Sequence, residues 1–300
     1  METENGKTIV VTGATGRQGG AVARELLKAG YLVRALTRNP SSRKAKALSR
    51  LGAEVLKCDL TDTDTLKQVL AGAWGVFAVF QSQEKGERGE METGRRFTAT
   101  AKNSGVKHFV YSSAAAANRK TGVPHFDSKA VIEAAVIGAR FPSHVILRPA
   151  FLMENFTSPW LRADLEMGRL CMALQPETKL QMVAAADVGK FGLAAFRKPA
   201  DFNGAEIDIA GDERTLPEAA DILPMASGRR LQFVQADIGE VRKQSPGMAA
   251  MMEWLDRAGP NIDLRAIRAK YGFKLLTLSQ WAMKTRWPLQ AGDTAEASRA

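Results

Sequence analysis

Three glycines follow the first apolar run of the chain at intervals of three residues. The run Thr8–Thr12 is predicted to be a strand, and Gly13, Gly16 and Gly19 come directly after it and lead into a helix predicted at Gln18–Ala29. Glycine permits a tight turn and a close backbone approach to a pyrophosphate, and the helix N-terminus adds a positive dipole end. The order of strand, glycine turn, helix and second strand, within about 30 residues, predicts a dinucleotide-binding βαβ unit.

The first half of the chain continues this alternation of strands and helices. Apolar, β-branched runs predict further strands at Leu32–Thr37, Glu54–Lys57, Gly75–Phe80, His108–Ser112 and His144–Leu147. Helical patterns predict helices at Asp62–Leu70, Thr93–Asn103 and Phe126–Ala139. The run Ile9–Val11 has no polar alternation, which indicates burial on both faces of a sheet. We therefore predict an α/β fold: a doubly wound parallel sheet (Rossmann) with a smaller C-terminal α+β lobe.

The second half of the chain lacks this regular alternation. After Pro149 come a segment rich in Trp, Met and Leu and a helical pattern at Asp187–Phe196, and the strand-like Glu206–Ile209 is placed to return to the main sheet. The expected division is a dinucleotide-binding Rossmann domain at 1–150, rejoined by a strand near 204–210, and a smaller substrate or partner lobe at 151–290. Residues 291–300 are small and polar, which predicts a disordered tail.

The positive charge of the chain is concentrated in the predicted dinucleotide-binding half. Lys and Arg outnumber Asp and Glu by 42 to 32 in the whole chain and by 23 to 13 within residues 1–150. This excess points to dinucleotide phosphates rather than nucleic acid, since no helix-turn-helix, zinc motif or aromatic-basic RNA signature accompanies it. Two cysteines are too few for a disulfide framework or a zinc site, so no metal is expected. Without a secretory signal or a long apolar run, we expect a cytoplasmic protein with no membrane contact.

The residues after the second predicted strand favour NADP(H) over NAD(H). An acidic side chain there would hydrogen-bond the ribose 2′-OH of NAD, but the sequence has Arg38. A guanidinium grips a 2′-phosphate with two parallel hydrogen bonds. Arg17 is the second candidate clamp, and Lys57, after the third strand, is an outside candidate. Each of these is otherwise an ordinary surface charge.

Further cofactor contacts are expected at the ends of the other strands. Asp59 follows the third strand and is expected to border the adenine, whereas Phe80 and Gln81 end the fourth strand on the path to the nicotinamide. Pro149 and Phe151 are expected near the same nicotinamide face. The loop residues expected to hold the pyrophosphate are Gly13, Thr15, Gly16, Arg17, Gln18 and Gly19.

The glycine loop is accompanied by further segments that point to one family. These segments are Thr37–Asn39, Val110–Ser113, His125–Lys129, Arg148-Pro149 with Glu154–Phe156, and Met182-Val183 with Asp187–Gly189. With them, residues 7–210 resemble the NmrA-like proteins, atypical members of the short-chain dehydrogenase/reductase superfamily. The resemblance implies a Rossmann domain with a small C-terminal lobe and NADP(H) as cofactor. It also implies one of two roles: an NADP-sensing regulator that binds other proteins, or an NADPH-dependent reductase, a class that includes quinone reductases.

The usual proton donor of this superfamily is missing. Ordinary members use a Tyr and a Lys four residues later on one helix face, where the ammonium lowers the pKa of the phenol. None of Tyr31, Tyr111 and Tyr271 has a Lys at this spacing, and His125 stands four residues before Lys129 instead. The candidate catalytic residues are therefore Lys129, as a ligand of the nicotinamide ribose or a solvated helix lysine, and His125, as a proton donor or a helix cap.

The candidate substrate residues are two serines and a set of apolar side chains. Ser112 and Ser113 stand where the superfamily places its substrate-binding Ser, with strand-end hydrogen bonding as the alternative. The apolar side chains expected to line an acceptor pocket, unless they belong to the core, are Phe80, Pro149, Phe151, Phe156 and Trp160.

These residues leave two functions open. Reduction of a quinone or related conjugated carbonyl is compatible with the missing Tyr, because a resonance-stabilised anion takes its proton later from water. The alternative is a non-catalytic redox sensor, in which NADP(H) occupancy shifts the shape of the protein and its binding to a protein partner. The expected partner is thus a small-molecule acceptor or a regulatory protein, and a homodimer is left open.

Overall fold

The computed structural model describes residues 6–81, 86–224 and 229–285, and these form two compact units. The first unit consists of Met1–Pro149 and Ala185–Ile209, and the second of Ala150–Ala184 and Ala210–Ala300. Each unit is described by itself below. The tail predicted at 291–300 lies outside the described residues.

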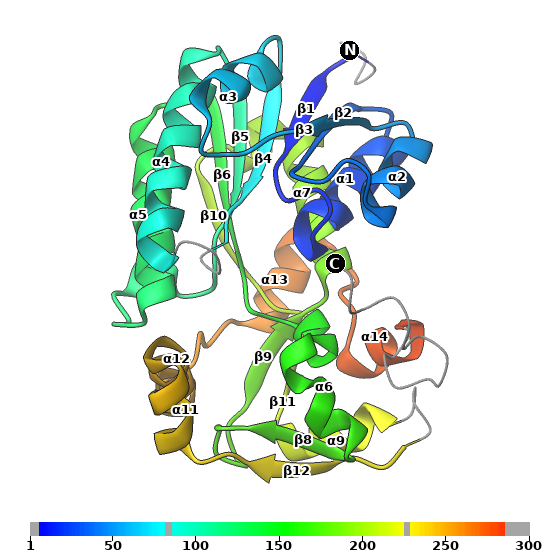
Figure 1. Ribbon diagram of the computed structural model, residues 1–300, viewed down its shortest axis with the longest axis vertical. Helices are drawn as coiled ribbons and strands as arrows, with labels where there is room; N and C mark the ends of the chain where they lie inside the picture. Colours follow the sequence, from blue (N-terminus) through cyan, green and yellow to red (C-terminus); the bar gives the residue numbers. More distant parts are fainter. Residues whose placement is uncertain (1–5, 82–85, 225–228, 286–300) are drawn as a thin grey trace. The chain divides into compact units, whose positions relative to one another are not determined.

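A seven-stranded parallel sheet forms the centre of the first unit (Figure 1). The strand order is β10-β6-β5-β4-β1-β2-β3, and every neighbouring pair is parallel. The predicted doubly wound parallel sheet is therefore confirmed. The strands are β1 (Thr8–Val11), β2 (Leu32–Thr37), β3 (Glu54–Lys57), β4 (Gly75–Val79), β5 (His108–Ser112), β6 (Ser143–Pro149) and β10 (Ala205–Ile209).

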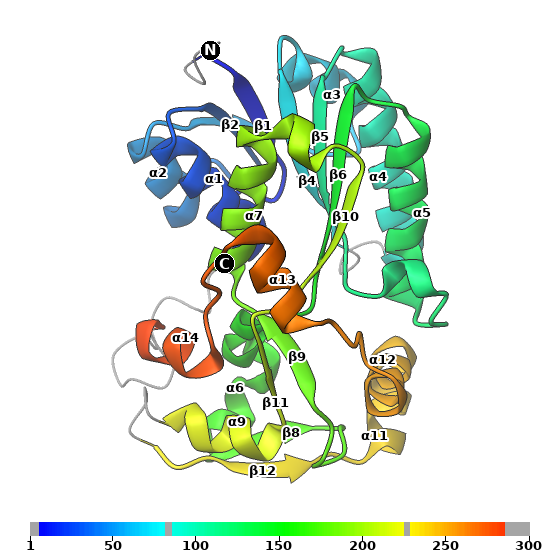
Figure 2. The ribbon, with the colours of Figure 1, turned by 180° about the vertical axis from the view of Figure 1, so that it is seen from behind.

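Helices cover both faces of this sheet, with α3, α4 and α5 on one face and α1, α2 and α7 on the other (Figure 1). Figure 2 shows α1 and α7 side by side, in agreement with their close packing. This two-sided cover explains the uninterrupted apolar strands, since Ile9, Val10 and Val11 are all fully buried. The helices are α1 (Arg17–Lys28), α2 (Arg43–Arg50), α3 (Thr63–Leu70), α4 (Gly86–Asn103), α5 (Pro124–Gly138), α7 (Ala185–Arg197) and α8 (Pro199–Phe202), with a 3₁₀ turn η1 (Ala117–Arg119).

Two segments of the second half of the chain belong to this first unit. The strand expected at Glu206–Ile209 is β10, which pairs with β6 at the edge of the sheet. The helix expected at Asp187–Phe196 is α7, and it packs against α1 in the first unit. The first unit thus takes more from the second half than the single returning strand that the sequence pattern indicates.

The second unit is built from two small sheets and short helices. One sheet has the order β11-β9-β7 and the other pairs β12 with β8. Its core contains fully buried side chains such as Phe156, Leu165 and Leu216, each of which contributes roughly 1.5–3 kcal/mol by leaving water. The strands are β7 (Phe151–Leu152), β8 (Arg169–Met172), β9 (Leu180–Val183), β11 (Asp212–Arg214) and β12 (Gln232–Gln235). The helices are η2 (Met153–Thr157), α6 (Pro159–Glu166), α9 (Leu216–Ile222), α11 (Ile238–Gln244), α12 (Pro246–Arg257), α13 (Leu264–Tyr271) and α14 (Leu278–Lys284).

Neither membrane-spanning helices nor disulfides occur in the described ranges. No helix there is both long and apolar enough to cross a bilayer. Cys58 is buried and Cys171 is partly exposed, and both are free thiols.

Candidate functional site

The glycine loop between β1 and α1 leaves no room for side chains at its three glycines. Gly13 adopts φ +56°, in the left-handed region that favours glycine, and the Gly16 N–H donates to the Gly13 carbonyl over 2.8 Å. A Cβ atom on Gly19 would lie 2.4 Å from the Gly13 oxygen and 2.5 Å from the Thr12 oxygen. α1 therefore starts tight against the end of β1, and the N–H groups of its first turn, which lack partners within the helix, lie at the loop. The half-buried residues of this loop are Thr15, Gly16, Arg17 and Gln18.

Thr12 ties the glycine loop to the end of β4. Its hydroxyl donates to the Val79 carbonyl and accepts from the Val79 N–H, each over 2.8 Å, and its side chain is fully buried. One residue further, the Phe80 ring packs inward among the aromatic side chains of the core, whereas Gln81 is exposed. Phe80 therefore presents its backbone rather than its ring at the end of β4, and Gln81 presents its side chain.

The two serines at the end of β5 have different surroundings. Ser112 donates to Gln18 Oε1 over 2.6 Å, which ties this strand to the glycine loop. The Ser113 N–H donates to the Leu147 carbonyl over 2.8 Å. The Ser113 hydroxyl is buried and interacts with the side chain of Tyr111. The structure thus joins Ser112 to the loop and encloses Ser113.

The basic residues expected at a 2′-phosphate lie where β2 and β3 end. Thr37 and Lys57 are register partners, so Arg38 follows β2 beside the end of β3, and both basic side chains are exposed. Asp59 shapes the turn after β3, because its Oδ1 accepts from the Thr61 N–H over 2.9 Å and from the Thr61 hydroxyl over 2.8 Å. The arrangement keeps two positive charges together at this corner of the sheet, with the Asp59 carboxylate in a turn next to them.

His125 and Lys129 share one face at the start of α5, as their spacing predicts. Lys129 Nζ donates to Glu90 Oε1 of α4, and the hydroxyl of Ser128 lies 3.0 Å from Glu90 Oε2. Burial lowers the pKa of His125, and the positive charge of Lys129 lowers it further. The His125 ring packs against Phe126, with ring centroids 4.5 Å apart. His125 is therefore held mainly in its neutral form near neutral pH.

Glu90 is a residue that the sequence analysis missed. Its side chain is fully buried, and along α4 it shares the buried side of the helix with Gly94, Phe97 and Ala101. A carboxylate in such an apolar stripe is costly to bury unless a partner neutralises it. That mismatch between the charge and the stripe is the signal by which the sequence could have revealed the residue.

A second buried ion pair, also missed, supports the end of β6. Arg148 donates from Nε to Glu133 Oε1 over 2.9 Å and from Nη2 to Glu133 Oε2 over 2.6 Å. It also contacts Glu206 on the neighbouring strand β10. This bidentate pair anchors α5 to β6 directly before Pro149, which is itself buried.

The apolar side chains expected to line an acceptor pocket are divided between the two units. Phe80 and Pro149 belong to the first unit, and the other three belong to the second. Phe156 lies in the core of the second unit, where its ring is 5.3 Å from that of the half-buried Phe151. Trp160 is 51% exposed at the start of α6. Of the three in the second unit, Phe151 and Trp160 are accessible to a ligand, while Phe156 is part of the packing behind them.

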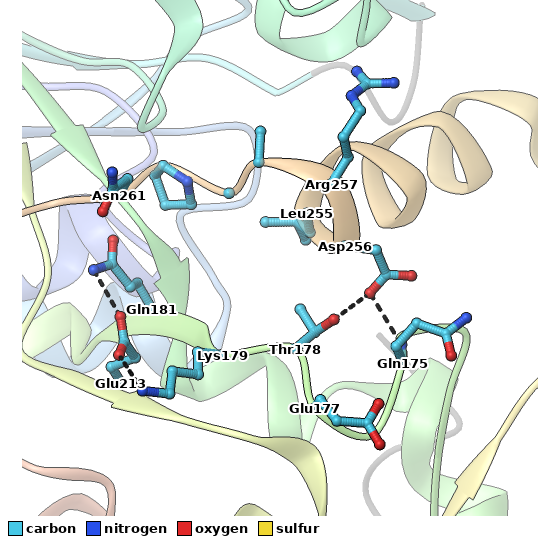
Figure 3. Close-up of a pocket in the computed structure, with 13 residues that line it drawn as sticks. Gln175, Glu177, Thr178, Lys179, Gln181, Glu213, Leu255, Asp256, Arg257 and Asn261 are labelled. Atoms are coloured by element: carbon cyan, nitrogen blue, oxygen red, sulfur yellow. Dashed lines mark hydrogen bonds and ion pairs between the residues drawn. The ribbon is translucent and has the colours of Figure 1, made fainter.

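The second unit contains a hollow of about 520 Å³ whose walls are polar (Figure 3). Asp256 of α12 accepts from the Gln175 N–H over 3.0 Å and from the Thr178 hydroxyl over 2.5 Å. On the other side, Gln181 donates to Glu213 over 3.0 Å. These side chains form hydrogen bonds with one another, and the lining carries both positive and negative charges. The hollow therefore does not suit a flat apolar acceptor.

Comparison with known proteins identifies related sequences. The sequence matches the NmrA-like family over residues 5–278. An NmrA-like family domain-containing protein of Dictyostelium discoideum is 29% identical over 251 residues, which cover 79% of this chain and 83% of that protein. An NmrA-like family domain-containing oxidoreductase of Aspergillus japonicus is 35% identical over 164 residues, which cover 52% of this chain and 50% of that protein. The match thus spans about half the length of that oxidoreductase.

Solved structures share the fold at low sequence identity. NmrA, a negative transcriptional regulator, in complex with NADP has a TM-score of 0.75 at 19% identity, covering 93% of this chain and 95% of NmrA. The NADPH-dependent quinone oxidoreductase QOR2 of Escherichia coli, in complex with NADPH, has a TM-score of 0.75 at 23% identity, covering 92% of this chain and 99% of that protein. At these identities the likeness shows the fold alone.

Proposed function

The chain belongs to the NmrA-like family, and from this premise we propose that it binds NADP(H) and is an NADPH-dependent reductase of quinones or related conjugated carbonyls. The observation that carries the proposal is the carboxyl end of the parallel sheet. There a loop whose three glycines leave no room for a side chain lies near Arg38, which occupies the position where an NAD-binding protein would have a carboxylate. Such crevices outside the carboxyl ends of parallel strands are where α/β sheets bind their ligands.

The proposal assigns a different part of NADP(H) to the residues at the carboxyl end of each strand. The loop N–H groups and the start of α1 bind the pyrophosphate, and Arg38, with Arg17 as a second clamp, binds the 2′-phosphate. Asp59 borders the adenine. Gln81, the backbone of Phe80 and Pro149 are assigned to the nicotinamide end. NAD(H) is the weaker ligand in this arrangement, because Arg38 has no 2′-phosphate to pair with.

The acceptor class follows from the proton chemistry of α5. When bound, NADPH supplies a hydride to the acceptor. Lys129 is assigned to the ribose next to the nicotinamide. Burial lowers the pKa of His125, which makes its imidazole a poor source of a proton near neutral pH. Saturated ketones need a proton donor as they are reduced, whereas the anion formed from a quinone is stabilised by resonance and takes its proton from water. We therefore assign conjugated acceptors to this site. The enclosed Ser113 and the core residue Phe156 are not among the residues that would contact them.

The reaction is tested by following the loss of NADPH absorbance with a panel of quinones and a matched panel of saturated ketones. The expected result is turnover with at least one quinone and none with the ketones. Turnover of ketones at a similar rate would contradict the assigned proton chemistry. Failure of the protein to bind NADPH in a calorimetric titration would overturn the whole proposal.

A second candidate function is a non-catalytic NADP(H) sensor that acts through a protein partner. It is favoured by the absence of a Tyr four residues before Lys129 and by the likeness in fold to the regulator NmrA. A sensor requires that NADP(H) bind two shapes of the protein with different affinity. Tight NADPH binding without turnover of any acceptor in the panel would favour this function over the reductase.

A further inference from the structure

Glu90 is a buried carboxylate whose two oxygens have separate partners. Oε1 accepts from Lys129 Nζ, and Oε2 lies 3.0 Å from the hydroxyl of Ser128. The glutamate side chain is fully buried, while 16% of the lysine side chain remains exposed. The ion pair therefore has a closed side, made by α4, and an accessible side, made by the lysine.

The pair restricts Lys129 without exhausting its hydrogen-bonding capacity. A lysine ammonium has three N–H donors, and Glu90 is the one acceptor that the described residues provide for it. A free lysine side chain would lose considerable rotamer entropy on binding a ligand. In this structure that freedom is already lost, because the buried carboxylate fixes the ammonium in place.

Polar side chains of β5 and of the residue after it are also buried near the carboxyl end of the sheet. The hydroxyl of Tyr111 is buried, lies within the electrostatic influence of Glu90 and interacts with the side chain of Ser113. Ser113, the residue directly after β5, also has a buried hydroxyl. Glu90 thus interacts with the buried Tyr111 hydroxyl as well as with Ser128 and Lys129, so it does not form an isolated ion pair.

We propose that Glu90 is a positioning residue, which holds the Lys129 ammonium at the carboxyl end of the sheet so that its two remaining N–H groups bind the ribose next to the nicotinamide. The inference rests on the proposed NADP(H) binding and deepens it. Glu90 acts through Lys129 and itself touches no cofactor. Its substitution therefore affects only ligands that carry the nicotinamide half.

The test compares two ligands in calorimetric titrations of the wild-type protein and Glu90→Gln. NADPH carries both halves of the cofactor, whereas adenosine 2′,5′-bisphosphate carries the adenosine half and the 2′-phosphate alone. Glutamine keeps the size of the side chain and an acceptor oxygen but removes the charge that orders Lys129. We expect the Kd for NADPH to rise about tenfold, and the Kd for the bisphosphate to stay unchanged.

Two further variants separate positioning from general damage to the fold. Glu133→Gln removes another buried carboxylate from α5, in its pair with Arg148, and is expected to lower the unfolding temperature while keeping the ratio of the two Kd values. Lys129→Met removes the group through which Glu90 is proposed to act. In that background Glu90→Gln should add no further loss of NADPH affinity, since the two substitutions affect one interaction.

Four outcomes would overturn the inference about Glu90. An unchanged Kd for NADPH in folded Glu90→Gln overturns the inference, as does a full additional loss in the Lys129→Met background. Equal losses for NADPH and the bisphosphate assign Glu90 a merely structural role and also overturn it. If the wild-type protein binds neither ligand, the proposed function fails, and this inference fails with it.

Discussion

The two ends of the seven-stranded sheet use buried polar side chains in opposite ways. At the amino end, His108 of β5 is 1% exposed, and its Nδ1 lies 2.8 Å from the hydroxyl of Ser143. Its ring packs between those of Trp74 and Phe196, with centroids 5.6 and 5.2 Å away. At the carboxyl end, Lys129 keeps donors beyond those that its ion pair uses.

This difference separates residues that hold the sheet together from residues that are placed to bind. A polar side chain enclosed by aromatic rings, like His108, contributes through packing and has no route to a ligand. Exposed or half-exposed groups around a glycine loop, like Arg38, keep their charge accessible. Substitutions at the carboxyl end should therefore change cofactor affinity, and those at the amino end should change stability.

The largest effect on the carboxyl end is expected for Gly19→Ala. The added Cβ would lie 2.4 Å from the Gly13 oxygen, so α1 has to move away from the loop that is proposed to bind the pyrophosphate. Such a displacement of the binding loop should raise the Kd for NADPH about a hundredfold or more. A calorimetric titration with NADPH should detect little or no binding.

The matched control for this substitution is Gly138→Ala at the end of α5. No atom lies within 4 Å of the position that its Cβ would occupy. The variant should bind NADPH like the wild-type protein and unfold at the same or a slightly higher temperature. Normal NADPH binding by folded Gly19→Ala would contradict the proposed role of the loop.

The amino end is tested by the pH dependence of stability. Burial lowers the pKa of His108 to about 4. In the unfolded chain a histidine titrates near pH 6.5, so as the pH falls below this value the unfolded state binds the proton first and stability is lost. Once both states are titrated, the loss amounts to about 3 kcal/mol. Urea unfolding between pH 7 and pH 4 measures it.

The comparison for this prediction is His108→Gln, which has no proton to gain. Its stability should be lower at pH 7 but should fall less steeply than that of the wild-type protein as the pH decreases. NADPH affinity at pH 7 should be unchanged, because the residue lies at the opposite end of the sheet from the proposed site. Parallel stability curves for the two proteins would show that His108 is not the group responsible.

The smallest of the three effects is expected for Arg38→Asp, because the rest of the loop stays intact. Loss of a charge-assisted pair with the 2′-phosphate should weaken NADPH binding about thirtyfold. The introduced carboxylate can accept from the ribose 2′-OH of NADH, so NADH binding should be kept or improved. Parallel titrations with the two cofactors measure this, and equal losses for both would refute the preference for NADP(H).

The strands of the first unit could be predicted closely because each is a local signal. The predictions at Leu32–Thr37, Glu54–Lys57 and His108–Ser112 coincide with β2, β3 and β5 residue for residue. Continuous apolar runs bounded by polar turns carry this information within a few residues. The start of α4 was placed too late, at Thr93 instead of Gly86, because its first turns are charged and lack an apolar stripe.

The second unit was not predictable in the same detail. Its strands have four residues or fewer, and its core joins segments far apart in the chain, such as Phe156 and Trp281. These strands also lack the regular alternation with helices that marks the strands of the first unit. The assignment of α7 to the first unit likewise depends on its packing against α1, which no local pattern encodes.

The sequence by itself determined the parallel sheet, the glycine loop and the basic residue after β2, because each depends on backbone conformation or on residues next to one another. Only the tertiary structure decided that Lys129 meets Glu90, 39 positions away, that Phe80 turns its ring into the core, and that Ser112 binds the loop while Ser113 is enclosed. The physical reason is that the partner of a buried charge or hydroxyl is chosen by packing among distant segments, and a sequence pattern reports only the neighbours along the chain.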